Sequence, residues 1–387
     1  MTGAAPADTP ANATVHVSGA GPAGLSAAIT LASGGRAVVV HERAPDVAHR
    51  FHHDFQGLEN WTTDGDVLDE LAAIGIRPEF EYAAFRETTL FDADGREHTY
   101  RSDRPFFYLV RRGDGEGTLD RSLARQALAA GAELRFNDPV QHLRDGGIVA
   151  EGPHGSDVIA VGYVFDTDAG DGAYAALADR LAPGGYAYLL IHRGRGTLAS
   201  CMFADFHRER EYLARTADFF GERVTFSMRN EQRFGGTGNF RPFRSVRRGP
   251  LLYAGEAAGF QDALWGFGMR YAMVSGHLAA RAVLAGAPDR YDEDWRARFG
   301  GELRAGAVNR FLIERLGDCG YRMLARRLDR APDPRAWLGR HYRSSLGTDV
   351  LYPFVRRMRP WPRDADHCVM EGCDCTWCRC THPQPQP

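Results

Sequence analysis

Three glycines and one acid within residues 14–43 have the types and spacing that most clearly indicate chemistry. Gly19, Gly21 and Gly24 form a Gly-x-Gly-x-x-Gly pattern between a β-rich run and a helix of small residues, and Glu42 follows Gly24 by 18 residues. The first glycine allows a tight turn, the second leaves room for a pyrophosphate, and the third lets the helix pack on the strand. The helix start offers N–H groups to phosphates, and the acid accepts hydrogen bonds from ribose hydroxyls. The stretch therefore predicts dinucleotide binding.

A second glycine region lies much further along the chain. The apolar run 251–254 predicts a buried strand that delivers Glu256, and a glycine-bounded loop then leads into a long helix that starts near Gly266 and Gly268. A carboxylate here can accept hydrogen bonds from a sugar-like chain, and the positive end of a helix stabilises negative charge on a reduced ring. These are the needs of the ribityl chain and the pyrimidine end of FAD.

Together the two regions resemble the FAD-dependent geranylgeranyl reductase family, within the larger para-hydroxybenzoate-hydroxylase-like superfamily of flavoproteins. The resemblance rests on residues 19–24 with 42–43, on 255–260, and on 265–269 with 271–280. Residues 109–123 also resemble the family's arginine-plus-helix segment, in which an arginine contacts the cofactor. The resemblance implies that FAD is bound by Gly19, Gly21, Pro22, Ala23, Gly24, Glu42, Arg43, Arg111 or Arg112, Gly255, Glu256, Gly266, Phe267, Gly268 and Met269.

Three stretches depart from the patterns of the relatives. Glu256 stands where the family usually has aspartate, which implies a shifted or water-mediated ribityl contact. Residues 165–170 replace the Asp-Gly motif of the aromatic hydroxylases, and residues 185–190 echo the substrate-sheet signature of prenyl reductases only loosely.

The fold class predicted is α/β, with a discontinuous Rossmann-like FAD-binding domain, a mixed β-sheet substrate domain, a helical C-terminal region and a Cys-rich tail. Within this plan the polar, aromatic stretch 49–61 is expected to be a loop over the cofactor, and residues 223–228 are expected to form a strand. The predicted parts are residues 14–84, 105–171 and 245–290 for the FAD-binding domain, 85–104 and 172–244 for the substrate sheet, 291–362 for the helical basic region, and 363–387 for the tail.

Composition restricts the classes of function. The 387 residues are 44% hydrophobic and 25% charged, which suits a protein of two or three domains with a sizeable core. The net charge of -3 argues against a nucleic-acid partner, since nucleic-acid binders usually carry excess positive charge. All 47 basic residues are arginine, so reactions that require a lysine Schiff base or ammonium are excluded. A flavin-dependent halogenase is disfavoured for the same reason.

Five of the seven cysteines lie near the C-terminus with the spacing Cys-x4-Cys-x-Cys-x2-Cys-x-Cys. Such density in a cytoplasmic protein indicates metal binding more often than disulfides. A set of four thiolates suits zinc or an iron–sulfur cluster equally, and a mobile thiol pair used in redox exchange is the other interpretation. The predicted ligands are Cys368, Cys373, Cys375, Cys378 and Cys380.

The C-terminal region is predicted to be helical and basic. Residues 321–363 hold eleven arginines against three acids, which suits either a solvated face or docking to a redox partner or a membrane surface. No apolar run is long enough to span a membrane, and residues 1–12 lack the features of a secretory signal. These observations predict a cytoplasmic protein that could also sit peripherally at a membrane.

The predicted function is that of an FAD-dependent oxidoreductase resembling geranylgeranyl reductases, with hydride transfer through flavin N5 to or from an unsaturated, largely apolar substrate. NAD(P)H is the candidate electron donor. The first alternative is an FAD-dependent monooxygenase that hydroxylates an aromatic or biosynthetic-pathway intermediate, and the second is a flavin-bearing redox sensor that acts through the Cys-rich tail. The sequence identifies no catalytic residue. Trp265 is the candidate for shaping the pocket, and Tyr186, Tyr188 and Phe203 either line it or fill the core of the sheet.

Overall fold

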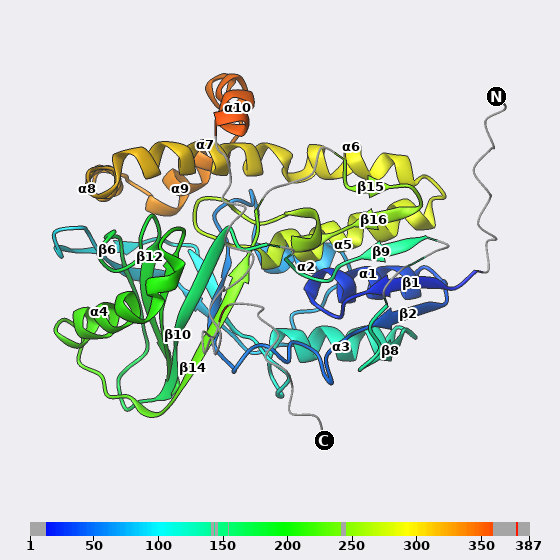
Figure 1. Cartoon of the computed structure of the whole chain (residues 1–387), viewed down its shortest axis with the longest axis horizontal. Coiled ribbons are helices and arrows are strands. Elements are labelled where there is room, and N and C mark those ends of the chain that lie inside the picture. The colour runs from blue at the N-terminus through cyan, green and yellow to red at the C-terminus, as the bar shows by residue number, and fades with distance from the viewer. Residues whose placement is uncertain are drawn as a thin grey trace.

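The chain forms a mixed α/β fold with parallel and antiparallel sheets and a helical C-terminal part, which confirms the fold class in outline. A computed structural model describes residues 13–140, 143, 146–153, 155–240, 245–358 and 377. Figure 1 shows the two larger sheets at opposite ends of the molecule, with the helices α6 (Tyr291–Trp295) and α7 (Gly301–Leu316) following one another along one side.

The first sheet has six strands in the order β15-β16-β9-β1-β2-β8. These strands are β1 (Val15–Ser18), β2 (Val38–His41), β8 (Glu133–Arg135), β9 (Gly147–Val149), β15 (Arg247–Arg248) and β16 (Leu251–Tyr253). Five of them run parallel, and the short edge strand β15 pairs antiparallel with β16. All four residues of β2 are buried, as expected for a strand of a parallel sheet that is covered on both faces.

Three helices accompany this sheet, namely α1 (Pro22–Ser33), α3 (Leu119–Ala129) and α5 (Met269–Leu284). Helix α1 packs against α5 over much of its length. Gly276 of α5 lies directly against the backbone of Ala23, so a side chain at position 276 would collide with the Ala23 carbonyl. The small residues therefore allow the middle of α5 to approach the beginning of α1.

The second sheet has seven strands in the order β14-β10-β13-β12-β11-β5-β6. These strands are β5 (Glu87–Phe91), β6 (Glu97–Arg101), β10 (Val158–Asp166), β11 (Gly172–Ala176), β12 (Tyr186–His192), β13 (Arg195–Met202) and β14 (Arg229–Gly238). Neighbouring strands are antiparallel except for β5 and β11, which are parallel. Helix α4 (Glu209–Gly221) covers one face, where Leu213 and Phe220 pack against Leu189 in a continuous core.

A small third sheet, in the order β3-β7-β4, joins the two larger ones. Its strands are β3 (Phe55–Glu59), β4 (Tyr82–Phe85) and β7 (Phe107–Arg111), and helix α2 (Val67–Ala73) follows β3. The prediction that residues 49–61 form only a loop is wrong for β3, because five residues there pair with β7.

The C-terminal part consists of helices, as predicted. They are α6 (Tyr291–Trp295), α7, α8 (Asp318–Asp329), α9 (Pro334–Tyr342) and α10 (Leu346–Met358). Helix α9 begins as the sequence rules expect, with Asp333 accepting a hydrogen bond from the Ala336 N–H at 3.0 Å and Pro334 in the first position. Among the described helices, none combines the length and apolar character needed to cross a bilayer.

Two expectations about the sheets need revision. The segment 105–171 contributes strands to all three sheets, with β9 in the first and β10 in the second. The strand expected at 223–228 is absent from those residues, and the strand β14 instead begins at Arg229. From Arg229 to Gly238 the chain runs beside β10 and pairs with it, so the strand begins at position 229.

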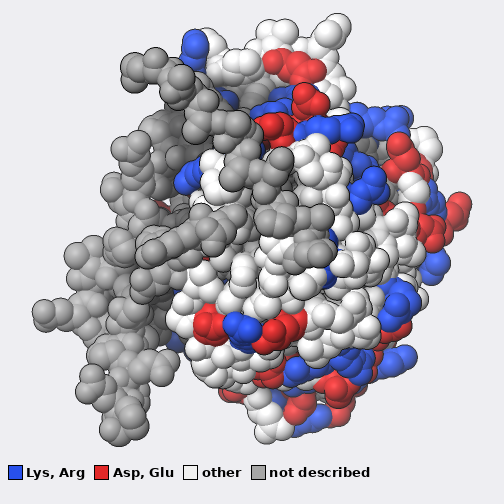
Figure 2. All heavy atoms as spheres, turned by 90° about the vertical axis from the view of Figure 1, so that its right-hand side faces the viewer, with Lys and Arg blue, Asp and Glu red and all other residues white. Residues whose placement is uncertain are grey.

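Charges of both signs are mixed on the surface. Figure 2 shows acidic and basic side chains interspersed on the end of the molecule that bears the six-stranded sheet. This mixture agrees with the small net charge of -3.

Candidate functional site

A continuous cavity of about 480 Å³ runs from the six-stranded sheet to the seven-stranded sheet. Twelve of the predicted cofactor contacts line it: Gly19, Gly21, Pro22, Ala23, Glu42, Arg43, Arg112, Glu256, Gly266, Phe267, Gly268 and Met269. The structure therefore brings the two distant glycine regions together around one space. The remaining three, Gly24, Arg111 and Gly255, are not on the cavity wall.

The first glycine turn combines a tight packing position with an open one. A Cβ at Gly24 would collide with the Gly19 carbonyl and approach Val17, so Gly24 lets α1 pack on β1. A Cβ at Gly21 would meet no atom within 4 Å, although Gly21 lines the cavity. The backbone at Gly21 thus borders free space, as the approach of a pyrophosphate requires.

The carboxylate of Glu42 lies at the end of β2 and holds this turn. Its Oε2 accepts a hydrogen bond from the Ala20 N–H at 2.8 Å, and its Oε1 accepts one from the Ala44 N–H at 2.9 Å. Because each carboxylate oxygen has further acceptor capacity, Glu42 can still accept hydrogen bonds from a sugar.

The second glycine region starts with a short 3-10 turn, η2 (Gly255–Ala258), after β16. Gly255 has a φ of +60° and its N–H donates to Ser275 Oγ at 2.9 Å, so this glycine shapes the turn rather than the cavity wall. Glu256 does line the cavity, and its Oε2 lies 3.6 Å from Arg50 Nη2. This ion pair joins the second region to the segment that follows β2.

Asp262, which the sequence analysis did not single out, organises the loop between η2 and α5. Its carboxylate accepts hydrogen bonds from the Leu264 N–H at 3.1 Å, the Trp265 N–H at 2.8 Å and the Tyr342 hydroxyl at 2.8 Å. Burial raises the pKa of this carboxyl to about 6. In the sequence, Asp262 is an acid within a glycine-rich loop, and an aspartate in an exposed surface turn would look the same. The sequence alone therefore could not show that this carboxylate is buried and holds the loop.

The raised pKa of Asp262 predicts a defined pH dependence of stability. A carboxyl whose pKa is higher in the folded state than in the unfolded state favours folding when protonated, and this contribution is lost as the pH rises through about 6. Relative to Asp262→Asn, the free energy of unfolding of the wild type should fall by about 2–3 kcal/mol between pH 4 and pH 7. Urea titrations of both proteins across this range measure the difference. Parallel pH profiles would contradict the assignment.

The structure distinguishes between the two arginines left open by the sequence. Arg112 is buried and lines the cavity, where its guanidinium forms two hydrogen bonds of 2.8 Å with Asp120. Arg111 points to the other face of β7, as successive strand residues do, and pairs there with Glu81. The prediction of a cofactor contact therefore stays with Arg112 and is not supported for Arg111.

A stack of charged and aromatic side chains covers Arg112. The guanidinium carbon of Arg112 lies 4.1 Å from the centre of the Phe51 ring, and that of Arg50 lies 4.7 Å from the same ring. Arg112 Nη1 also donates to Gln56 Oε1 at 3.2 Å, and Gln56 Nε2 donates to the buried Asp54 at 2.8 Å. The segment after β2 thus places Arg50 beside Arg112 at the cavity, an arrangement that no spacing in the sequence revealed.

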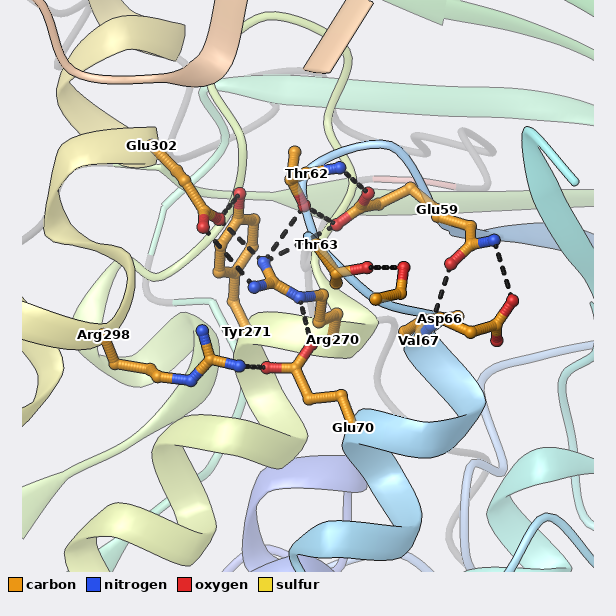
Figure 3. Close-up of polar contacts among 12 residues, drawn as sticks. Glu59, Thr62, Thr63, Asp66, Val67, Glu70, Arg270, Tyr271, Arg298 and Glu302 are labelled. Atoms are coloured by element: carbon orange, nitrogen blue, oxygen red, sulfur yellow. Dashed lines mark hydrogen bonds and ion pairs between the residues drawn. The ribbon is translucent and has the colours of Figure 1, made fainter. Parts of the chain in front are cut away.

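The first turn of α5 is fixed by a buried cluster of polar and charged residues, drawn in Figure 3. We call it the Arg270 cluster, and its members are Glu59, Glu70, Arg270, Tyr271 and Glu302. Arg270 Nε lies 2.7 Å from Glu70 Oε2, and its Nη1 lies 2.7 Å from Glu302 Oε2 and 3.7 Å from Glu59 Oε1. The Tyr271 hydroxyl donates to Glu302 at 3.0 Å. The cluster therefore ties α5 to α2, to the end of β3, and to α7.

The seven-stranded sheet forms the other half of the cavity. Its register places the cavity-lining residues on one face: Tyr188 lies opposite Ala175 of β11 and Ala199 of β13, and Ala175 lies beside Leu90 of β5. The face opposite to α4 is the cavity wall, and its members are Thr88, Leu90, Tyr100, Val158, Ala160, Ala173, Ala175, Tyr186, Tyr188, Leu190, Cys201, Gly236 and Gly238. Aromatic and aliphatic side chains are interspersed there with alanine and glycine, whose small size leaves room for the cavity.

The loop before α5 covers the half of the cavity that the seven-stranded sheet forms. The Tyr186 hydroxyl donates to the Trp265 carbonyl oxygen at 2.8 Å, and the two rings meet edge to face at 5.7 Å. Trp265, Tyr186 and Tyr188 line the cavity, whereas Phe203 packs in a separate core with Phe240. Helices α8 and α9 complete the wall with Leu324, Leu328 and Leu338.

With this geometry in view, solved structures give the most informative comparison. A geranylgeranyl bacteriochlorophyll reductase-like protein from Thermoplasma acidophilum is similar with a TM-score of 0.67 and 17% identity, over 89% of this chain and 98% of that chain. The flavin-dependent brominase Bmp2 is similar with a TM-score of 0.61 and 16% identity, over 89% and 98%. The chain has the fold of these flavin enzymes.

A flavoprotein/dehydrogenase from Cytophaga hutchinsonii shares this flavoenzyme fold, with a TM-score of 0.61 and 15% identity over 89% of this chain and 96% of that chain. No protein-family model matches the chain, and no curated protein is significantly similar to it in sequence. The fold is thus preserved at sequence identities too low to transfer an activity.

The predicted metal site lies outside the described residues. Cys368, Cys373, Cys375, Cys378 and Cys380 all fall in the undescribed part of the tail, so zinc or an iron–sulfur cluster there stays a prediction. Within the described ranges, no three His, Cys, Asp or Glu side chains gather as metal ligands would. Of the tail, the structure describes Trp377, which is buried against Phe206 and His207 beside α4.

Proposed function

We propose that this chain binds FAD across the two glycine regions and acts as an FAD-dependent oxidoreductase. The observation that carries the proposal is the convergence of two helix beginnings and two acids, Glu42 and Glu256, on one cavity. Open space at Gly21 and the positive ends of α1 and α5 suit a pyrophosphate and a ring that gains negative charge. The residues present therefore fit the cofactor that the sequence predicted.

Bound FAD would supply hydride transfer at its N5 atom. The chain's own residues would bind the dinucleotide at Gly21 and Glu42, and the first turn of α5 would stabilise negative charge on the ring. The apolar residues of the sheet would exclude water from the reacting atoms.

The substrate half of the cavity favours an unsaturated, largely apolar substrate. Its wall is built from rings and aliphatic chains, among them Tyr186, Tyr188, Leu190 and Leu328, and few charged groups reach it. Pockets with this lining gain most of their affinity from buried apolar surface, and a few polar groups orient the ligand. A reductase acting on such a substrate is the function that we favour.

The primary test is cofactor binding by the purified full-length protein. We expect a yellow protein, or a colourless one that binds FAD stoichiometrically with quenching of flavin fluorescence. Anaerobic addition of NADH or NADPH, followed by loss of the flavin absorbance, would then identify the electron donor. Correctly folded protein that refuses added FAD would refute the proposal.

A monooxygenase is the second candidate, and the aromatic rings at Tyr186, Tyr188 and Trp265 favour it because they can stack on an aromatic substrate. The two candidates differ in what reduced enzyme yields with oxygen and substrate. An oxygenated product identifies the monooxygenase, whereas a substrate reduced at its double bond, with no oxygen incorporated, identifies the reductase. The brominase Bmp2 gives no support for halogenation here, because the chain contains no lysine.

A bulkier side chain in the substrate half of the cavity should weaken substrate binding without changing FAD binding. Ala175 faces the cavity opposite Tyr188, so Ala175→Phe would place a ring in the space that a substrate occupies. We expect the KM of the reductase substrate to rise about tenfold or more, since overpacking removes room for the ligand. FAD affinity, measured by fluorescence titration, should stay unchanged. A parallel loss of FAD affinity would place both ligands in one half of the cavity.

A further inference from the structure

The outward face of α10 is apolar and uncovered by the described residues. Leu346, Val350 and Phe354 are 88%, 75% and 63% exposed, and they are the most exposed large apolar side chains of the described chain. They recur at every fourth residue, so they lie on one face of the helix. Leu351, 46% exposed, widens this face. We call these four residues the α10 face.

The opposite side of α10 is anchored, which fixes the direction of the α10 face. Val355 is buried, and Tyr352 packs against a core that includes Ala307 of α7. Asp349 pairs with Arg304 of α7 at 2.9 Å. Figure 1 shows α10 standing beyond α7, away from both large sheets. The α10 face therefore points out from the molecule rather than toward a groove of its own fold.

The surroundings of the α10 face are basic. Arg356 and Arg357 are exposed in the last turn of α10, and none of the described acids forms an ion pair with them. The acids of this region are engaged elsewhere: Asp329 pairs with His98 at 3.0 Å, and Asp349 pairs with Arg304. The positive charge beside the apolar face is thus not neutralised by its described neighbours.

We propose that the α10 face docks this protein onto a membrane surface that carries anionic lipids. An exposed apolar stripe flanked by arginine is the pattern of helices that lie in the interfacial plane, with apolar side chains among the acyl chains and cations at the headgroups. Helix α10 has 13 residues, which is too short to span a bilayer and suits a helix lying on its surface.

Charge favours this occupant over a second copy of the chain. A symmetric dimer through the α10 face would present the same patch on both subunits, and so would contribute two sets of Arg356 and Arg357 to one interface. Like charges at such an interface repel each other, whereas anionic headgroups attract them. The proposal goes beyond the proposed function and does not depend on bound FAD.

Vesicle binding by the purified full-length protein tests the proposal. The probes are vesicles of phosphatidylcholine alone and vesicles with about 30% phosphatidylglycerol, separated from free protein by sedimentation. We expect binding to the anionic vesicles that weakens with salt. Val350→Ser with Phe354→Ser should lower the partition coefficient about tenfold or more, because two apolar side chains lose their burial in the bilayer. Arg356→Gln with Arg357→Gln should weaken the binding and reduce its salt dependence.

A matched control is Leu128→Ser on α3, since Leu128 is 53% exposed but lies away from the C-terminal helices. It should bind vesicles as the wild type does, and thermal melting should show that all variants are folded. Wild-type protein that stays in solution with anionic vesicles at low salt would overturn the proposal. So would a Val350→Ser, Phe354→Ser variant that binds like the wild type. Concentration-dependent self-association abolished by the same variant would instead assign the α10 face to a second copy.

Discussion

Replacing Arg270 by methionine is expected to lower the free energy of unfolding by about 3–5 kcal/mol, the usual range when one partner of a buried ion pair is removed. Arg270 is 2% exposed, and its guanidinium faces Glu59, Glu70 and Glu302. Without it, these carboxylates would remain buried with too few partners, and burial already raises the pKa of Glu302. Urea unfolding followed by circular dichroism measures the loss.

The same variant should regain part of its stability at low pH. Removing the cation raises the pKa of Glu302 further, so the deficit relative to the wild type is largest at neutral pH and shrinks as Glu302 becomes protonated. Arg298→Gln is the matched control, because Arg298 pairs with Glu70 but is 46% exposed, and should cost less than about 1 kcal/mol. Should Arg270→Met fail to fold, Arg270→Lys keeps the comparison measurable. An unfolding midpoint equal to that of the wild type would show that the cluster does not stabilise the fold.

Gly21→Ala is expected to leave the fold intact and to weaken FAD binding by about tenfold or more, equivalent to about 1.4 kcal/mol. The φ of Gly21 is -83°, which alanine adopts readily, and a methyl group there meets no protein atom within 4 Å. The methyl group would instead enter the space that the pyrophosphate needs. Fluorescence titration with FAD, together with a thermal melt, separates binding from stability.

Gly24→Ala gives the contrasting result. Its methyl group would collide with the Gly19 carbonyl, so we expect a loss of stability of about 1–3 kcal/mol or more from overpacking between α1 and β1. If Gly21→Ala bound FAD as tightly as the wild type does, the pyrophosphate would not lie at this turn. The proposed position of the cofactor would then be wrong, but the packing role of Gly24 would be unaffected.

The features that sequence analysis predicted are those whose causes are local. Gly19, Gly21 and Gly24 act within one turn, and the role of each follows from a backbone distance that a side chain would disturb. The N-cap at Asp333 with Pro334 after it, which the sequence analysis did not single out, is a local pattern of the same kind. Such patterns can be recognised in a sequence because the interacting groups are only a few residues apart.

Features that depend on tertiary contacts could not be predicted. Arg111 and Arg112 are neighbours of the same type, and only the pairing of β7 decides that Arg112 faces the cavity. The Arg270 cluster draws its acids from three distant segments, so no spacing reveals it. Asp262 becomes important only because Tyr342 and two backbone N–H groups reach it.

Strand β14 illustrates a case in which local preference misleads. Residues 229–238 are rich in glycine and polar side chains, which are rare in strands, whereas residues 223–228 contain Val224 and Phe226 and look more suitable. The structure places the strand at 229–238 because these residues can pair with β10 at the edge of the sheet. Glycines there also leave the cavity open, since Gly236 and Gly238 line it.

The strand order of the six-stranded sheet has a consequence for biosynthesis. β9 lies between β1 and β16, and α1 packs on α5, so the sheet is complete only after β16 has been made, and α1 obtains its main helical neighbour only after residue 284 has been made. Until then the apolar surfaces of β9 and α1 are incompletely covered, and such nascent chains are prone to aggregation. Fragments that stop before α5 should therefore need chaperones, while the full chain folds as one unit.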